Sequence, residues 1–441
     1  MENLSSTLIY FSRNTALEDV PESALHILKL SLLDWFAVAI AGTQEPASRT
    51  ALQMLNAEAG TPETTVIGQS TRLPARAAAL ANGITSHALD YDDTHFLHIG
   101  HPSVTVFPAA LAMAERQNAT GAGFLIAALT GYEASCRIGH WLGRSHYEAG
   151  FHMTATAGTF GATLAASRLL GLNETQTSHA LGLAATQASG LKVQFGSMGK
   201  PYNAGKAAAN GIEATLLAGL GFTSSPDALS GFAQSHAGEM RPLETVLDGL
   251  GARFVLEQVQ HKFHACCHGL HATLEALEIL FQEQKPDFRL FEKLDIQTHP
   301  RWLKVCNKKD PKTGLEAKFS YRQTAAMTLL GIDTGALNSF DDALCTDPKI
   351  VTLRHKISVN GNPELPDTGA SIRLTCTGQP PLSTSFDLAI PLPAKERETR
   401  VLHKAKTLLG LEQAHILWQE IRHLEQENNL SKLLQAGTQS V

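Results

Sequence analysis

Long runs of small apolar residues with a helical repeat constrain the fold of this chain most strongly. In segments such as 74–90 and 203–221, apolar residues recur every three to four positions, which is typical of a helix with a buried face. Ala and Gly side chains let neighbouring helices approach closely, so we expect a dense bundle with mostly short connections. The predicted helices cover residues 21–42, 74–90, 104–117, 121–139, 153–171, 174–190 and 203–221.

The pattern changes after about residue 285. Short stretches with alternating or β-branched residues predict strands at LDIQTHP, HKISVN, ASIRLTCTG and STSFDLAI, with a helix at SYRQTAAMTLLGI between the first two. A chain of 441 residues exceeds the usual size of a single core. We therefore predict a mainly α protein, with a large all-α helical domain over residues 1–268 to which residues 394–441 return. A smaller inserted α+β domain covers residues 269–393.

Charge and cysteine content narrow the possible partners and location. The net charge of −6 provides no attraction to nucleic acid or to an anionic membrane, so an anionic substrate must meet a local group of cations. The apolar stretch from Leu25 to Ala41 contains Lys29 and Asp34, which favours a buried helix over a membrane span. Six scattered cysteines and an N-terminus without a basic, signal-like region are typical of a cytoplasmic protein.

The densest group of titratable residues lies between residues 87 and 103, where three carboxylates and four histidines lie close together in the chain. Such groups shift one another's pKa values, as general acid–base chemistry requires. We expect Asp90 and His101 to flank a substrate and Thr94 to donate a hydrogen bond to it. The alternatives are that Asp92, Asp93 or Thr94 caps the helix at 104–117 with the remaining histidines on a solvated loop, or that a metal is bound. The metal alternative uses Asp90, Asp92, His98 and His101, although no HExxH or HxH spacing supports it.

Two further stretches of this half carry candidate residues. Tyr147 and His152 precede a helix of small residues, whose N-terminal N–H groups suit a carboxylate ligand; the alternative is a packed tyrosine and an ordinary loop histidine. Lys200 lies in a glycine-flanked turn directly before a helix of low charge, where an ammonium group suits a substrate carboxylate. Its alternative is an exposed lysine, the usual case for this residue type.

The second half offers weaker candidates. Lys262 and His268 lie at the predicted domain boundary, which is a preferred place for clefts. We expect Lys262 to bind a second carboxylate of the substrate and His268 to accept a proton. Lys318 and Ser320 are further candidates for substrate binding. Capping of the following helix by Ser320 is at least as consistent with the pattern.

These stretches together resemble the MmgE/PrpD family. The motifs that carry the resemblance span residues 82–321 and are, in chain order, HALDYDDTH with HPS, HYEAGFHMT, GSMGKPYNAGKAAANG, KFHACCHGLHA and GLEAKFSY. The resemblance implies an all-α domain built from both chain ends, an inserted α+β domain, a homodimer, an active site between the domains, and neither metal nor organic cofactor. The positions that match family active-site residues are Asp90, Thr94, His101, His152, Lys200 and Lys262. Tyr147 matches a tyrosine suggested as an acid/base group in the epimerase branch.

The family contains 2-methylcitrate dehydratases, cis-aconitate decarboxylases and iminodisuccinate epimerases, whose substrates share a C–H bond beside a carboxylate. We therefore expect a small di- or tricarboxylate substrate, with Lys200 and Lys262 binding its carboxylates. His101, His152 or Tyr147 would exchange protons, and Asp90 would orient His101. Dehydration is the expected outcome, with epimerisation or decarboxylation as alternatives. A metal-dependent hydrolase and a non-catalytic binding protein are the rivals from other classes.

Overall fold

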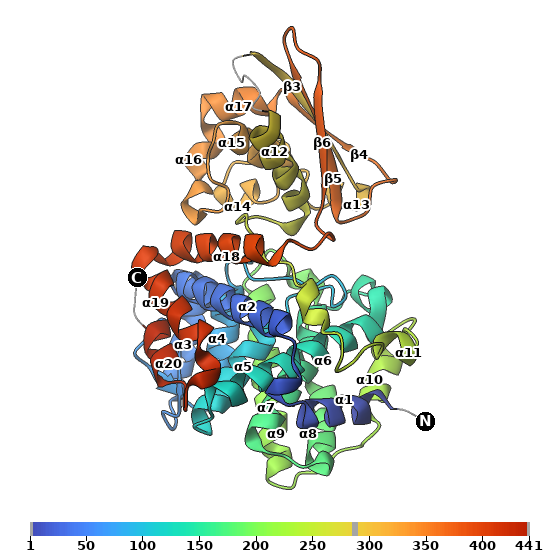
Figure 1. The fold of residues 1–441 in the computed structure, drawn as a ribbon, viewed down its shortest axis with the longest axis vertical. Helices are drawn as coiled ribbons and strands as arrows, with labels where there is room; N and C mark the ends of the chain where they lie inside the picture. The colour runs from blue at the N-terminus through green and yellow to red at the C-terminus, as the bar shows by residue number, and fades with distance from the viewer. Residues whose placement is uncertain (1–2, 285–289, 439–441) are drawn as a thin grey trace. The chain divides into compact units, whose positions relative to one another are not determined.

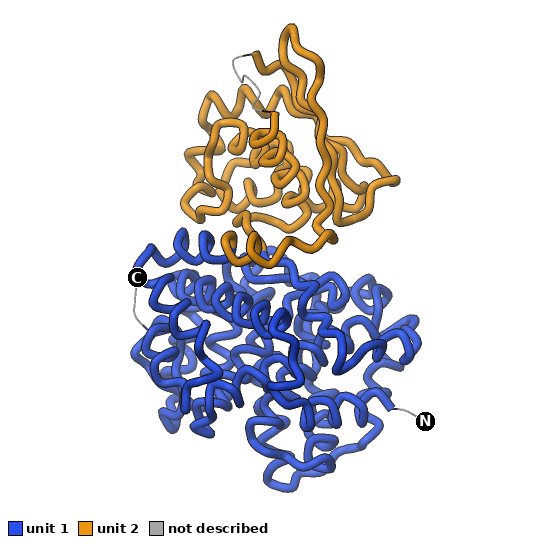
Figure 2. Tube along the Cα trace, in the orientation of Figure 1, with its two compact units in different colours: residues 1–261, 401–441 blue, residues 262–400 orange. Residues whose placement is uncertain are grey.

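The computed structural model describes residues 3–284 and 290–438, and these residues are mainly helical (Figure 1). The chain divides into two compact units, unit 1 with residues 1–261 and 401–441 and unit 2 with residues 262–400 (Figure 2). The mainly α class is thus confirmed, with a small sheet present as expected. The predicted domain boundaries at residues 268 and 394 stay predictions.

Unit 1 consists of helices apart from one short pair of antiparallel strands. Its helices are α1 (Leu4–Asn14), α2 (Glu22–Ala41), α3 (Pro46–Glu58), α4 (Ala75–His87), α5 (Ser103–Arg116), α6 (Gly121–Glu148), α7 (Met153–Leu170), α8 (Glu174–Gln187), α9 (Gly199–Gly219), α10 (Ala228–His236), α11 (Leu243–Val246), α19 (Leu411–Arg422) and α20 (Ser431–Thr438). The strands are β1 (Thr64–Thr65) and β2 (Arg72–Leu73), and α18 (Ala394–Leu409) spans the boundary between the units in sequence.

Close helix contacts in unit 1 depend on glycine. Helix α7 packs against α5, α6 and α9, and α4 packs against α9. A Cβ atom on Gly83 of α4 would lie 2.7 Å from the Cα of Gly205 in α9, and one on Gly131 of α6 would lie 2.6 Å from the carbonyl oxygen of Gly161 in α7. The prediction of closely packed helices is therefore correct, and these crossings bring α4, α5, α7 and α9 together.

Helix α2 confirms the prediction of a buried helix. In the described residues, the segment Glu22–Gln44 has the length and apolar composition of a membrane span, and 83% of its most apolar window is buried in the structure. Its two buried charges are paired inside unit 1, because Lys29 Nζ lies 2.5 Å from Glu425 and Asp34 lies 2.5 Å from Lys404 Nζ. Paired charges remove most of the cost of burying them.

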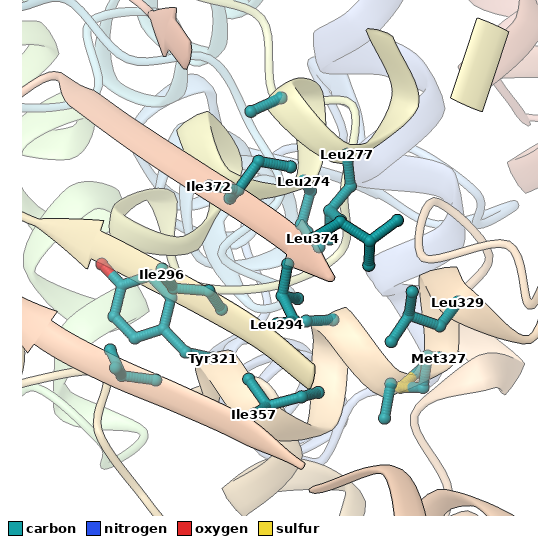
Figure 3. Packing of buried hydrophobic residues seen from close by; sticks show 14 of the residues in the cluster. Leu274, Leu277, Leu294, Ile296, Tyr321, Met327, Leu329, Ile357, Ile372 and Leu374 are labelled. Carbon is teal, nitrogen blue, oxygen red and sulfur yellow. The ribbon is translucent and has the colours of Figure 1, made fainter. Parts of the chain in front are cut away.

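Unit 2 contains a four-stranded sheet in the order β4-β3-β5-β6, in which β3 runs parallel to β4 and antiparallel to β5. The strands are β3 (Phe291–Thr298), β4 (Ile357–Gly361), β5 (Gly369–Cys376) and β6 (Leu382–Asp387), where the sequence predicted them. The helices are α12 (His271–Gln284), α13 (Pro300–Leu303), α14 (Gly314–Ala317), α15 (Tyr321–Leu329), α16 (Asp342–Thr346) and α17 (Pro348–Arg354). Figure 3 shows Leu294 and Ile296 of β3 among leucines of α12 and α15, which form a core within unit 2.

Candidate active site

The candidate site lies in unit 1 around the loop that joins α4 to α5. His87 is the last residue of α4, and His101 lies two residues before α5 begins. Between them Asp90 adopts a left-handed backbone conformation with φ 51°, which reverses the chain after the helix. After this reversal, Asp90 pairs with Lys200, whereas Asp92 contacts His87 and His101.

Asp92 contacts two imidazole rings with its two carboxylate oxygens. His87 Nδ1 lies 2.9 Å from Oδ1, and His101 Nδ1 lies 2.8 Å from Oδ2. Burial alone would raise the pKa of Asp92, but the adjacent His87 and His101 imidazoles outweigh burial and hold that pKa well below its usual range. An ionised carboxylate only accepts hydrogen bonds, so we assign the protons of both rings to Nδ1. The expectation that Asp90 orients His101 is therefore wrong, because Asp92 lies closer and contacts the opposite ring nitrogen.

His101 is buried, and burial lowers its pKa to about 4 despite the opposing effect of Asp92. The ring is therefore neutral at neutral pH, with its lone pair on Nε2. That atom lies 3.7 Å from Asp90 Oδ1. The backbone N–H of His101 donates to Thr154 Oγ1 at 3.0 Å, an approach that requires Gly100, because a Cβ there would lie 2.7 Å from the same oxygen. This hydrogen bond fixes the backbone at His101.

His152 directly precedes α7 and is also buried. The side-chain amide of Asn203 on α9 lies 3.2 Å from His152 Nδ1. An amide NH2 group only donates, so we assign the proton of the neutral His152 ring to Nε2, the opposite tautomer to His101. Burial, together with the neighbouring positive groups, lowers the pKa of His152 well below its usual range. The two histidines therefore differ in role, since one offers a lone pair at Nε2 and the other an N–H.

Lys200 lies in the first turn of α9, not in a turn before the helix as expected. Its ammonium group lies 2.6 Å from Asp90 Oδ1 and 5.3 Å from the ring centroid of Phe195. The Phe195 ring also lies 5.0 Å from the His152 ring in an edge-on arrangement. Asp90, His101, His152 and Lys200 are therefore brought together beside the Phe195 ring.

Comparison with known proteins agrees with this arrangement. The MmgE/PrpD N-terminal domain matches residues 6–240, and the MmgE/PrpD C-terminal domain matches residues 264–378. The chain belongs to the MmgE/PrpD family. The resemblance predicted from the motifs is thereby confirmed.

Curated relatives within this MmgE/PrpD family include decarboxylases. A cis-aconitate decarboxylase of Aspergillus terreus is 28% identical over 446 residues, which cover 92% of this chain and 89% of the relative. The cis-aconitate decarboxylase of Homo sapiens is 33% identical over 218 residues, which cover 47% of this chain and 45% of the relative.

Two other predicted site residues of unit 1, Thr94 and Tyr147, make contacts that stabilise the fold. The backbone N–H and carbonyl groups of Thr94 pair with those of Gln260 at 2.8 Å each, which anchors the loop. Tyr147 lies near the end of α6 with the Lys192 ammonium 3.7 Å from its ring centroid, and its ring packs against a hydrophobic cluster. Their roles in an MmgE/PrpD-type reaction stay predictions.

Four of the predicted site residues lie in unit 2. Lys262 is buried, and His268 lies with its ring 4.9 Å from that of His271. Lys318 Nζ lies 5.6 Å from the ring centroid of Phe340. Ser320 caps α15, since its hydroxyl accepts from the Gln323 N–H and donates to the Lys308 carbonyl. Ser320 thus adopts the capping alternative that the sequence allowed.

The alternative of a capped helix and a solvated loop at residues 92–98 is wrong. Helix α5 starts after Pro102 without a side-chain cap, and Asp93 accepts a hydrogen bond from Ser103 Oγ at 2.6 Å instead. His95 and His98 are buried, and their ring nitrogens lie near the carbonyl oxygens of Val255 and Ser135 at 2.7 and 3.0 Å. These two histidines stabilise the loop that carries the site.

His87, Asp90, Asp92 and His101 could each offer one ligand atom to a metal, with all four atoms within 4.8 Å of one another. Two observations disfavour this use. The Lys200 ammonium is already at ion-pair distance from Asp90, and Asp92 contacts an imidazole with each oxygen. A divalent cation would meet a fixed positive charge and displace both contacts. In unit 2, the group His264, Glu275 and Glu278 has the Arg400 guanidinium bound to both oxygens of Glu275.

Reasoning from the sequence missed three features of the candidate site. It did not assign His87 or Asn203 to the site, and it did not identify Asp92 as the carboxylate that contacts His101. His87 and Asp92 are five positions apart, and their contact depends on the left-handed turn at Asp90. Asn203 lies among small residues close to Lys200, and nothing in its spacing marks it as a site residue. A histidine at the end of an otherwise apolar helix was the one available indication.

Proposed function

We propose that this protein is a lyase that removes carbon dioxide from a small, planar tricarboxylate of the cis-aconitate type, without a metal or organic cofactor. One observation carries the proposal: a buried, neutral His101 with a free lone pair, a buried His152 N–H and the Lys200 ammonium converge on one point of unit 1. This set can bind carboxylates and exchange one proton, which is all that such a reaction requires.

The relatives favour decarboxylation among the outcomes open to this family. Proteins named cis-aconitate decarboxylases align over most of the chain, as in the match with the Aspergillus terreus enzyme. The sequence alone placed dehydration first. Dehydration and epimerisation need the same proton chemistry, so they become the other outcomes of the test below.

The proposed chemistry follows from the charge that develops. Loss of carbon dioxide breaks a C–C bond and leaves its electron pair on an allylic carbon, delocalised into a neighbouring carboxylate. Lys200 pairs with that carboxylate, and the Nε2–H of His152 donates to one of its oxygens, which stabilises the dienolate. A proton then adds to carbon, so each turnover takes up one proton from solvent.

His101 is the proposed carrier of that proton. Its pKa of about 4 keeps it neutral before binding. A bound polyanion stabilises the imidazolium form and raises this pKa, so the ring takes up a proton at Nε2 when the substrate binds. The site would thus load its own acid only in the complex.

The test is incubation with cis-aconitate, 2-methylcitrate and iminodisuccinate in D2O, followed by NMR. Decarboxylation predicts loss of one carboxylate carbon and one deuterium at a new C–H position. Deuterium uptake with an unchanged carbon skeleton would indicate epimerisation, and loss of hydroxyl would indicate dehydration; either result, or no reaction, would contradict the proposal. Activity retained after exhaustive chelation would also exclude the metal-dependent hydrolase.

Kinetic constants of single-residue variants test the proposed roles of His101 and Lys200. His101→Gln should lower kcat by about a hundred-fold or more, the usual scale for a lost acid–base group. Lys200→Ala should chiefly raise KM, because it removes a cation that binds a carboxylate. Lys206→Ala, on the same helix, is the matched control and should leave both constants near the wild-type values. A His101→Gln enzyme with normal kcat would remove His101 from the mechanism.

We also propose that the protein acts as a cytoplasmic homodimer, and that Lys262, His268 and Lys318 contribute to substrate binding. The family resemblance supports the homodimer and Lys262, the few scattered cysteines support the cytoplasmic location, and the sequence pattern supports His268 and Lys318. Size-exclusion chromatography with light scattering, and KM values of Lys262→Ala, test them.

A further inference from the structure

We propose that His87 is a positioning residue, which holds Asp92 in place and thereby keeps the proton of His101 on Nδ1 and its lone pair on Nε2. This inference rests on the proposed function, since it concerns the group that carries the proton. His87 is not among the residues that the motifs assigned, and it contacts the same carboxylate as His101.

The geometry makes Asp92 a shared acceptor. His87 Nδ1 lies 2.9 and 3.1 Å from the two carboxylate oxygens, and His101 Nδ1 lies 2.8 Å from one of them. All three side chains are almost completely buried. His87 is hydrogen-bonded to this carboxylate and His101 Nδ1 contacts it, so a rotation of Asp92 away from His101 would also disturb its hydrogen bond with His87.

His87 also lies against both acid–base histidines. Its ring centroid is 4.6 Å from that of His101 and 5.9 Å from that of His152, onto which it stacks at an interplanar angle of 22°. Its Nε2 atom is buried without a hydrogen-bond partner among the described residues. The His87 ring is hydrogen-bonded to Asp92 and packs on His152, so it fixes the spacing between His101 and His152.

The hydrogen bond between His87 and Asp92 also affects the basicity of His101. A hydrogen bond donated by His87 spreads the negative charge of Asp92, so less of that charge favours the imidazolium form of His101. Without the donor, Asp92 would interact more strongly with His101 and raise its pKa. The other charged or titratable groups that interact with this cluster are Asp90, Asp93, His98, His152 and Lys200, and substitution of His87 leaves all of them in place.

The experiment compares His87→Phe, which keeps a ring but removes the donor, with His87→Asn, whose amide can donate to Asp92 from the position of Nδ1. His87→Phe should lower kcat/KM by about ten- to a hundred-fold, the scale typical of lost outer-shell partners of a functional histidine. The alkaline limb of its pH profile of kcat, where His101 in the complex loses its proton, should move to higher pH. His87→Asn should recover most of the rate and the wild-type position of that limb.

His146→Phe provides the matched control, because His146 is a buried histidine hydrogen-bonded to Thr156 and to the His236 carbonyl. Its alkaline limb should not move. Equal losses in His87→Phe and His87→Asn without any shift of the alkaline limb would show that His87 is merely structural and would overturn the proposal.

A second readout does not depend on turnover. Nitrogen-15 NMR of labelled histidines, with the His101 signals assigned by their loss in His101→Gln, reports the tautomer and pKa of His101. In the wild type, we expect the Nδ1–H tautomer; in His87→Phe, we expect a higher pKa and a mixture of tautomers. An identical titration in both proteins would contradict the positioning role, whereas absence of activity on the substrate panel would contradict only the proposed function.

Discussion

Three carboxylates within four positions of the chain occupy three different environments. Asp90 has a side chain that is 36% exposed and pairs with Lys200. Asp92 is buried between two imidazoles, whereas Asp93 is buried beside the Ser103 hydroxyl. Their pKa values diverge accordingly, since Asp92 is held ionised while burial raises the pKa of Asp93 to about 8. Residue type and spacing alone could not distinguish them.

The raised pKa of Asp93 predicts a pH-dependent stability. An acid with a pKa of about 8 in the folded state and about 4 in the unfolded state binds its proton more tightly when folded. Its contribution to the free energy of unfolding is therefore lost as pH rises from 4 to 8, by at most about 1.4 kcal/mol per pH unit. Asp93→Asn is uncharged and avoids this loss.

Melting temperatures of both proteins at pH 5, 6, 7 and 8 provide the measurement. Near pH 5 the two should be similar, and the advantage of Asp93→Asn should grow until about pH 8. Parallel curves over this range would show that Asp93 is ionised in the folded protein, contrary to its burial and to the Asp34 charge nearby.

At the scale of elements, the site depends on how closely helices approach. Helix α9 carries both Lys200 and Asn203, and α4 ends at His87, so the crossing of these two helices sets the positions of all three residues. Gly83 and Gly205 meet at that crossing. Any side chain at this point separates the helices that hold the site.

Gly205→Ala should therefore destabilise the protein. The added Cβ would lie 2.5 Å from the Leu80 carbonyl oxygen and 2.6 Å from Ile84 Cγ1. Overpacking of this kind costs about 1–3 kcal/mol, which exceeds the gain of about 1 kcal/mol from replacing glycine in a helix.

Gly231→Ala in α10 is the control, since a Cβ there has no neighbour within 4 Å and Gly231 is exposed. It should raise the melting temperature, while Gly205→Ala lowers it. If Gly205→Ala melts at or above the wild-type temperature, the crossing is less tight than the structure indicates.

At the scale of the whole molecule, each unit has its own hydrophobic core. The cluster around Leu294 and Ile296 belongs entirely to unit 2 (Figure 3), whereas the cluster that contains Phe160 and Leu164 belongs to unit 1. Units with separate cores can unfold in separate steps, so a single free energy of unfolding need not describe the protein.

Calorimetry can separate the two cores. Leu294→Ala and Leu164→Ala each remove a fully buried leucine, at a cost of about 2–5 kcal/mol. Each variant should lower one component of the melting curve and leave the other near its wild-type temperature. A single transition that both variants shift equally would show that the two units unfold together.

The sequence by itself determined most of the long helices of unit 1, the strands of unit 2 and the family, and it predicted His101, His152 and Lys200 as site residues. Periodicity and motif order are local properties, so they survive without knowledge of packing. Only the tertiary structure decided that Asp92 rather than Asp90 orients His101, and that His87 and Asn203 belong to the site. Those relations depend on one left-handed residue and on the close crossings of α4, α7 and α9, which no local pattern in the chain encodes.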